Sequence, residues 1–172
     1  DDELQLLPGS TKYIVPGAPL VNAGLVSAFD ALYFYNGGAG SNSGTYNFRG
    51  DFGLHDGGFG GSFSNTGLLT KTLGAGDSAI NGITFNNSGT IDAQTGTILF
   101  NGGALSFADG SVFSGAGRVS VVTNASWAGT QNTAAGNLHF GGGTQTGTTA
   151  ALNGNVHWTA GDLAGTWQVN GG

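Results

Sequence analysis

Residues 90–121 read TIDAQTGTILFNGGALSFADGSVFSGAGRVSV, and this stretch is built from a unit of seven residues. Short runs rich in apolar residues begin every seven positions. Turn-forming residues such as Gly96 and Asp109-Gly110 separate the runs. The apolar residues that share one phase of this repeat are Ile91, Ile98, Leu105, Val112 and Val119.

An apolar residue every seven positions is typical of a coiled coil, but this stretch cannot form one. Every unit contains one to three glycines, and a helix does not tolerate glycine at that density. Within the short runs the apolar residues alternate, as in Ile91 and Ala93 or Leu105 and Phe107. Alternation predicts strands, so each unit is expected to be a strand of three to five residues followed by a tight turn.

A second, longer repeat distinguishes between two possible arrangements of these strands. Antiparallel hairpins and a solenoid both fit the seven-residue unit. The segment FSNTG at 63–67 recurs as FNNSG at 85–89, an offset of 22 positions. Two periods in a ratio near three favour a coil with three sides. We therefore predict an all-β fold, a three-sided parallel β-helix with about 21–22 residues per coil.

This coil length makes specific predictions about which residues stack on one another. Side-chain amides that stack along the axis can form a ladder of hydrogen bonds. The expected pairs are Ile91 over Val112, Ile98 over Val119, and Asn65 over Asn87.

The first third of the chain lacks the regular repeat. All three prolines lie there, at Pro8, Pro16 and Pro19, and residues 20–35 fit either a short helix or irregular strands. We predict a capping or junction segment over 1–55 and β-helix repeats over 56–172. Terminal coils of a solenoid need polar caps. None is evident before Gly172, so we expect the repeats to continue in the natural protein.

Composition excludes several classes of function. The chain has 172 residues, 35 of them glycine, and a net charge of −6 with only four Lys and Arg. Four scattered bases cannot follow a phosphate backbone, so nucleic-acid binding is not expected. No apolar run approaches the roughly 20 residues of a membrane span. Cysteine is absent, which excludes disulfides and thiolate metal sites and is compatible with export.

No constellation of residues predicts catalysis, a cofactor or a metal. Asp92 and Asp109 are the best-placed acid pair, but Asp109 forms an ordinary Asp-Gly turn and Asp92 is expected to face solvent. His139 and His157 lie 18 positions apart in similar strands and are expected to face outward, without a third ligand. Two fragments similar to calcium-binding repeats, at 55–58 and 74–77, are interpreted as turns. We therefore predict that the chain is not an enzyme.

Aromatic residues raise the alternative of carbohydrate binding, because exposed rings can stack on sugars. The candidate stacking residues are Trp127, Trp158 and Trp167, together with the cluster Tyr33-Phe34-Tyr35. The competing interpretation is that these rings fill the core.

The segments FNNSGTID at 85–92, GTILFNGG at 96–103 and SGAGRV at 114–119 resemble a known repeat. They are similar to the FNNSGT-type β-strand repeats of large bacterial surface and secreted proteins, of the filamentous-haemagglutinin-like and autotransporter-associated kinds. The resemblance is close over residues 60–125 and loose over 126–172. It implies a parallel β-helix with an extracellular structural or adhesive role, and it supplies no catalytic residues.

The first hypothesis is thus a non-enzymatic structural module of a bacterial surface protein, adhesin or filament, secreted or held at the cell surface. Its expected partners are neighbouring repeats of the same protein, further copies of itself, or a surface polysaccharide. A carbohydrate-binding module is the second hypothesis and a polysaccharide-active enzyme the third.

Overall fold

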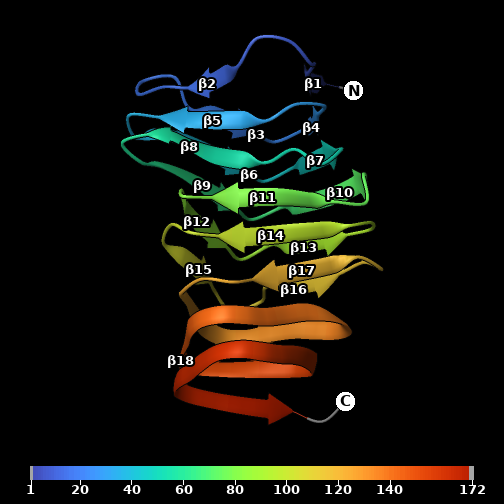
Figure 1. Ribbon diagram of the computed structural model, residues 1–172, viewed down its shortest axis with the longest axis vertical. Helices are drawn as coiled ribbons and strands as arrows, with labels where there is room; N and C mark the ends of the chain where they lie inside the picture. Colours follow the sequence, from blue (N-terminus) through green and yellow to red (C-terminus); the bar gives the residue numbers. More distant parts are fainter. Residues whose placement is uncertain (1, 171–172) are drawn as a thin grey trace.

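The computed structural model describes residues 2–170 and shows a parallel β-helix of about seven turns. In Figure 1 the coils are stacked along the long axis, from β1 at the top to the last turn of β18 at the bottom. All regular elements among the described residues are strands, so no helix there could cross a membrane. The predicted fold class is confirmed.

Each strand from β1 to β15 pairs in parallel with the third strand after it, so the strands form three walls. The first wall contains β1 (Glu3–Leu6), β4 (Leu25–Ala28), β7 (Thr45–Arg49), β10 (Leu68–Leu73), β13 (Thr90–Ala93) and β16 (Val112–Ser114). The second wall contains β2 (Lys12–Ile14), β5 (Leu32–Tyr35), β8 (Leu54–Gly58), β11 (Asp77–Asn81), β14 (Thr97–Asn101) and β17 (Arg118–Val121). The third wall contains β3 (Leu20–Asn22), β6 (Gly38–Asn42), β9 (Gly61–Asn65), β12 (Thr84–Asn87) and β15 (Leu105–Phe107). The long strand β18 (Ala125–Asn170) continues all three walls.

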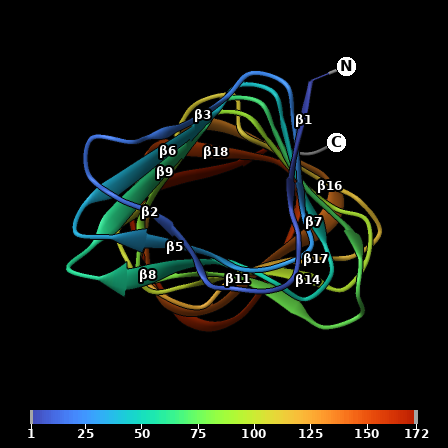
Figure 2. The same ribbon diagram turned by 90° about the horizontal axis from the view of Figure 1, so that it is seen from above.

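The walls enclose a continuous apolar core, which Figure 2 shows end-on as the space inside the superposed coils. The alternation seen in the sequence determines what enters it. In β13, Ile91 and Ala93 are fully buried, while Thr90 and Asp92 lie on the outer face. Each fully buried large apolar side chain contributes roughly 1.5–3 kcal/mol to folding. The core therefore contributes favourably to holding the coils together.

Of the two predicted apolar stacking pairs, one is confirmed and the other is wrong. Ile98 lies over Val119, as predicted. Ile91 lies over Phe113 and not over Val112, whose side chain is only half-buried on the outer face. The step from β13 to β16 is 22 positions and not 21. A shift of one residue moves every side chain to the opposite face of a strand.

An asparagine ladder runs inside the corner that follows the third wall. Asn65 donates to the Oδ1 of Asn87 over 2.7 Å, which confirms the expected contact. The ladder is longer than predicted, because Asn22 donates to Asn42 over 2.6 Å and Asn42 donates to Asn65 over 2.7 Å. All four side chains are buried, and each amide also donates to a backbone carbonyl. The buried amides are thus paired with one another and with the backbone.

A column of glycines beside the ladder explains why the motif Asn-x-Gly recurs. A side chain at Gly89 would collide with the carbonyl oxygen of Gly67, and one at Gly67 would collide with that of Gly44. Only glycine allows the corners of successive coils to approach this closely. The motif occurs in four coils, at 22–24, 42–44, 65–67 and 87–89.

Residues 3–55 take part in the same stack. The region 20–35 forms strands β3, β4 and β5, and not a helix. Across the expected boundary after residue 55, β7 pairs with β10 and β6 pairs with β9. The role of 1–55 as a capping or junction segment stays a prediction, but its backbone pairing is continuous with the coils that follow.

The coils of β18 are tighter than the others. Their corners are made within the strand by single residues in the left-handed region, which are glycines except for Thr149, because a residue with a side chain is strained there. Trp127 contacts Gln145, 18 positions further along, across one such coil. The glycines at these corners are Gly129, Gly136, Gly143, Gly154, Gly161 and Gly165.

Candidate functional site

The outer face of the second wall carries a row of aromatic side chains, one coil after another. Tyr13 on β2 lies in register with Tyr33 on β5, and Tyr33 lies in register with His55 on β8. The ring centroids of Tyr13 and Tyr33 are 5.8 Å apart, and those of Tyr33 and His55 are 5.3 Å apart. Tyr35 joins the row at 6.0 Å from Tyr13. We call Tyr13, Tyr33, Tyr35 and His55 the tyrosine strip.

Local sequence explains why these rings face outward. In β5 the side chains alternate, so Leu32 and Phe34 enter the core while Tyr33 and Tyr35 point away from it. Tyr13 is 54% exposed and Tyr35 is 37% exposed. Exposed rings that lie together on a folded surface are typical of binding sites.

Two glycines, Gly57 and Gly58, lie next to the rings of Tyr13 and Tyr35. A side chain added at Gly57 would come within 3.4 Å of the Tyr13 ring, and one at Gly58 within 3.3 Å of the Tyr35 ring. Tyr13, Val15 and Tyr35 line an open hollow of about 350 Å³.

A loop next to the strip holds a further exposed aromatic residue. Phe59 is 87% exposed and has a left-handed backbone, with φ of 63°. This conformation is costly for a residue with a large side chain. The Oδ1 of Asp56 accepts hydrogen bonds from the amides of Gly58 and Gly60 on either side of Phe59, and these bonds stabilise the loop.

The one cation near the strip is neutralised. Lys12, next to Tyr13, donates to Asp30 over 3.0 Å. The hydrogen bond from Lys12, with a second from the Ala31 amide, lowers the pKa of Asp30. The strip therefore combines aromatic faces and hydroxyl groups with no uncompensated positive charge among the residues described around it.

The three predicted tryptophans do not form a shared platform. Trp127 is fully buried, stacked on Phe107 with ring centroids 4.2 Å apart. Trp167 is half-buried and packs against Trp127 at 6.1 Å. Trp158 is 54% exposed, and its ring nitrogen donates to the carbonyl of Ala160. Of the three, only Trp158 offers a largely exposed ring, so sugar stacking stays a prediction for that residue and does not fit the burial of Trp127.

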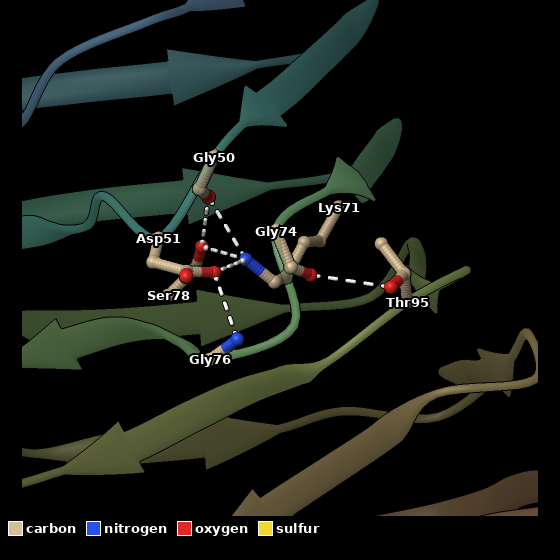
Figure 3. Close-up of polar contacts among 7 residues, drawn as sticks. All are labelled: Gly50, Asp51, Lys71, Gly74, Gly76, Ser78 and Thr95. Carbon is tan, nitrogen blue, oxygen red and sulfur yellow. Dashed lines mark hydrogen bonds and ion pairs between the residues drawn. The ribbon is translucent and has the colours of Figure 1, made fainter.

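A buried lysine forms the most concentrated polar cluster on the inner side of the walls. Lys71 occupies the core position between Phe48 and Ala93 and is fully buried. Its ammonium donates to the Gly50 carbonyl over 2.8 Å, to Asp51 over 2.7 Å and to Ser78 over 3.1 Å, as Figure 3 shows.

The three acceptors match the three N–H donors of the ammonium. Asp51 is half-exposed, and it also accepts from the amide of Gly76. The hydrogen bond from Lys71 is the main cause that lowers the pKa of Asp51. Lys71 and Ser78 are both fully buried, so neither side chain is accessible to a substrate from outside. The hydrogen bond from Lys71 to Asp51 joins one coil to the preceding one.

His139 and His157 lie on the outer surface, as expected, and stack on each other. Their ring centroids are 4.6 Å apart and their planes differ by 13°. Burial is the main cause that lowers the pKa of His139, and the nearby charges of Arg118 and His157 lower it further. Among residues 2–170, no three His, Asp or Glu side chains come close enough to hold a metal ion.

The lowered pKa values of two histidines, His55 and His139, predict that the free energy of unfolding falls in mild acid. The folded state disfavours protonated His139, and burial lowers the pKa of His55 in the same way. Above the unfolded value of about 6.5 both states are neutral and stability is unaffected. Below it the unfolded chain binds protons more readily, so stability decreases until the folded-state pKa is passed. Urea midpoints at about pH 7.5 and about pH 5.5, either side of the ordinary histidine value, should show this loss, and His139→Gln should reduce it. Identical pH profiles for the two proteins would contradict the assignment.

The acid pair considered in the sequence has structural roles. Asp92 accepts from Thr70 and Ser114 in the neighbouring coils of the first wall. Asp109 accepts from the amide of Thr130 at a turn. The two carboxylates are thus each engaged in joining coils.

Sequence reasoning missed Tyr13, His55 and the Lys71 cluster. The strip had a partial signal, since the alternation of Leu32 to Tyr35 already places two tyrosines on one face. The register that brings Tyr13 and His55 beside them depends on coils of 20 and 22 residues, which nothing local specifies.

Comparison of the chain with protein-family models, with curated proteins and with solved structures gives no match.

Proposed function

We propose that this chain is a non-enzymatic structural module of an extracellular bacterial surface protein, adhesin or filament. The observation that carries the proposal is the uninterrupted stack of coils. Three parallel walls and one apolar core join successive coils along the described chain, and the asparagine ladder joins four of these coils. A stack of this kind works as a stiff spacer, because each coil is held by its neighbours on both sides.

Two further features support this role. The polar clusters join one coil to the next, as Lys71 does through Asp51 and Asp92 does through Thr70. The repeats at 85–92 and 96–103 resemble those of large bacterial surface proteins. In such a protein the neighbours of this stack would be further repeats of the same chain or a second copy, since free strand edges pair with other strands.

Protease treatment of intact cells of the source organism tests the location. An antibody against this chain should bind unbroken cells or the culture medium, and external protease should remove that signal while a cytoplasmic marker stays intact. If the antibody binds only after lysis, the extracellular role is overturned.

A further inference from the structure

We propose that the tyrosine strip binds a neutral polysaccharide. The inference rests on the strip alone and does not depend on where the protein is located. It assigns the binding role to Tyr13, Tyr33 and Tyr35, three residues from the first two coils, in place of the tryptophans near the other end of the stack.

The spacing of the rings fits a polymer of repeating units. Tyr13 and Tyr33 occupy the same register position in adjacent coils, which lie about 4.8 Å apart. Their planes are tilted by 46°, and Tyr35 is turned 71° from Tyr13. The strip therefore presents several ring faces at different angles along the solenoid axis, and a chain of sugar rings could contact one face after another.

The chemistry of the strip favours sugars over purely apolar ligands. A pyranose has an apolar C–H face that packs on the negative face of an aromatic ring, and hydroxyl groups at its edge. Tyrosine supplies both a ring face and a hydroxyl group. His55, half-buried at one side of the strip, adds a ring nitrogen that can hydrogen-bond to a sugar hydroxyl.

The charge of the region indicates a neutral ligand. Lys12 is paired with Asp30, Asp56 lies exposed beside the strip, and the whole chain carries a net charge of −6. An acidic polysaccharide or a nucleic acid would meet repulsion and, among residues 2–170, would find no free cation near these rings.

The shape argues for a polymer lying on the surface. The hollow beside Tyr13, Val15 and Tyr35 is open, whereas a small molecule usually binds in a site that encloses most of its surface. Gly57 and Gly58 place no side chain against the rings of Tyr13 and Tyr35. Proline-rich peptides also bind aromatic grooves, and a second copy of the chain could cover the strip, so both are included as outcomes of the test.

Affinity electrophoresis of the full chain tests the proposal. Native gels would contain one neutral polysaccharide each (a soluble β-glucan, xylan, galactomannan or dextran), with alginate as the acidic control and bovine albumin as the non-binding protein. We expect at least one neutral polysaccharide to retard the chain and alginate not to. The double variant Tyr13→Ala and Tyr35→Ala should lose about tenfold or more in affinity, since it removes two of the three ring faces offered to the sugar chain.

Two matched variants separate binding from folding. Val169→Ala removes an exposed apolar side chain outside the strip and should bind normally. Tyr13→Phe keeps the ring face and should retain most of the affinity. Circular dichroism and urea midpoints confirm that each variant is folded.

The proposal is overturned if none of the neutral polysaccharides retards the chain, or if the double variant binds as well as the parent. It is also overturned if a polyproline peptide binds the strip and the sugars do not. Dimers that form through the strip, seen as a concentration-dependent mass that the double variant abolishes, would assign the surface to a second copy. None of these results bears on the cell-surface location, which protease treatment tests separately.

Discussion

Replacing Trp127 with alanine is expected to lower the free energy of unfolding by about 4 kcal/mol, the usual range for a buried tryptophan. Trp127 is fully buried and contacts four other aromatic rings, Phe107, Phe113, Phe140 and Trp167, at centroid distances from 4.2 to 6.1 Å. Its ring nitrogen donates to Gln145 over 2.9 Å. The substitution removes this packing and leaves the buried amide oxygen of Gln145 without its donor.

Urea denaturation followed by far-ultraviolet circular dichroism measures this effect. Trp158→Ala is the matched control, because Trp158 is 54% exposed, and its loss should cost no more than about 1 kcal/mol. Trp127→Phe should fall between the two, since it keeps a ring in the stack but still leaves Gln145 unpaired. Equal losses for Trp127→Ala and Trp158→Ala would show that Trp127 is not a core residue.

The second large effect concerns the buried lysine. Asp51→Asn should destabilise the chain by about 3 kcal/mol, because it leaves the buried ammonium of Lys71 without its counter-charge. Lys71→Met should cost less, about 1 kcal/mol, since methionine fills the same core position and Ser78 still donates to the Gly50 carbonyl over 2.9 Å. Asp51 is half-exposed and can turn to water when Lys71 is absent.

A double-mutant cycle checks this assignment. The variant with both substitutions should be more stable than Asp51→Asn alone, because no buried charge then remains. Asp77→Asn, at an exposed aspartate of the same region, is the control and should change stability by less than about 0.5 kcal/mol. Additive effects of the two substitutions would exclude a direct ion pair.

The same pair predicts a change in acid sensitivity. The Lys71 contact lowers the folded-state pKa of Asp51, so its contribution to stability is present above the ordinary aspartate value of about 3.9. It is lost as the pH falls through the lower, folded-state pKa of Asp51. Lys71→Met should show a smaller loss of stability over this acid range than the parent chain.

Local pattern was enough to predict the class of fold. The units at 90–121 alternate apolar and polar residues over three to five positions and then turn at glycine, and such a pattern can only bury its apolar face in strands. The ratio of the two periods predicted three walls, and the repeat of Asn65 at Asn87 predicted the ladder. Two further members, Asn22 and Asn42, carry the same Asn-x-Gly motif and could have been found by searching for it.

The site depended on information that no local pattern contains. Among the paired strands, coil steps range from 19 positions between Val119 and Leu138 to 26 between Leu54 and Ile80. Because an extra residue at a corner changes which residues become neighbours in the next coil, the sequence could not place Tyr13 beside Tyr33 or Tyr33 beside His55. For the same reason the approach of Asp51 to Lys71, across a step of 20 positions, was not foreseen.

The sequence by itself thus determined the strands, their number per coil and the residues that alternate into the core, because these follow from side-chain period and glycine position. Only the tertiary structure decided that Trp127 is buried and Trp158 exposed, that Val112 lies on the outer face, and that a lysine occupies the core. These outcomes depend on the length of each individual coil and on which partners the neighbouring coils supply. The free energy of burying a ring or a charge is set by those partners and not by the residue alone.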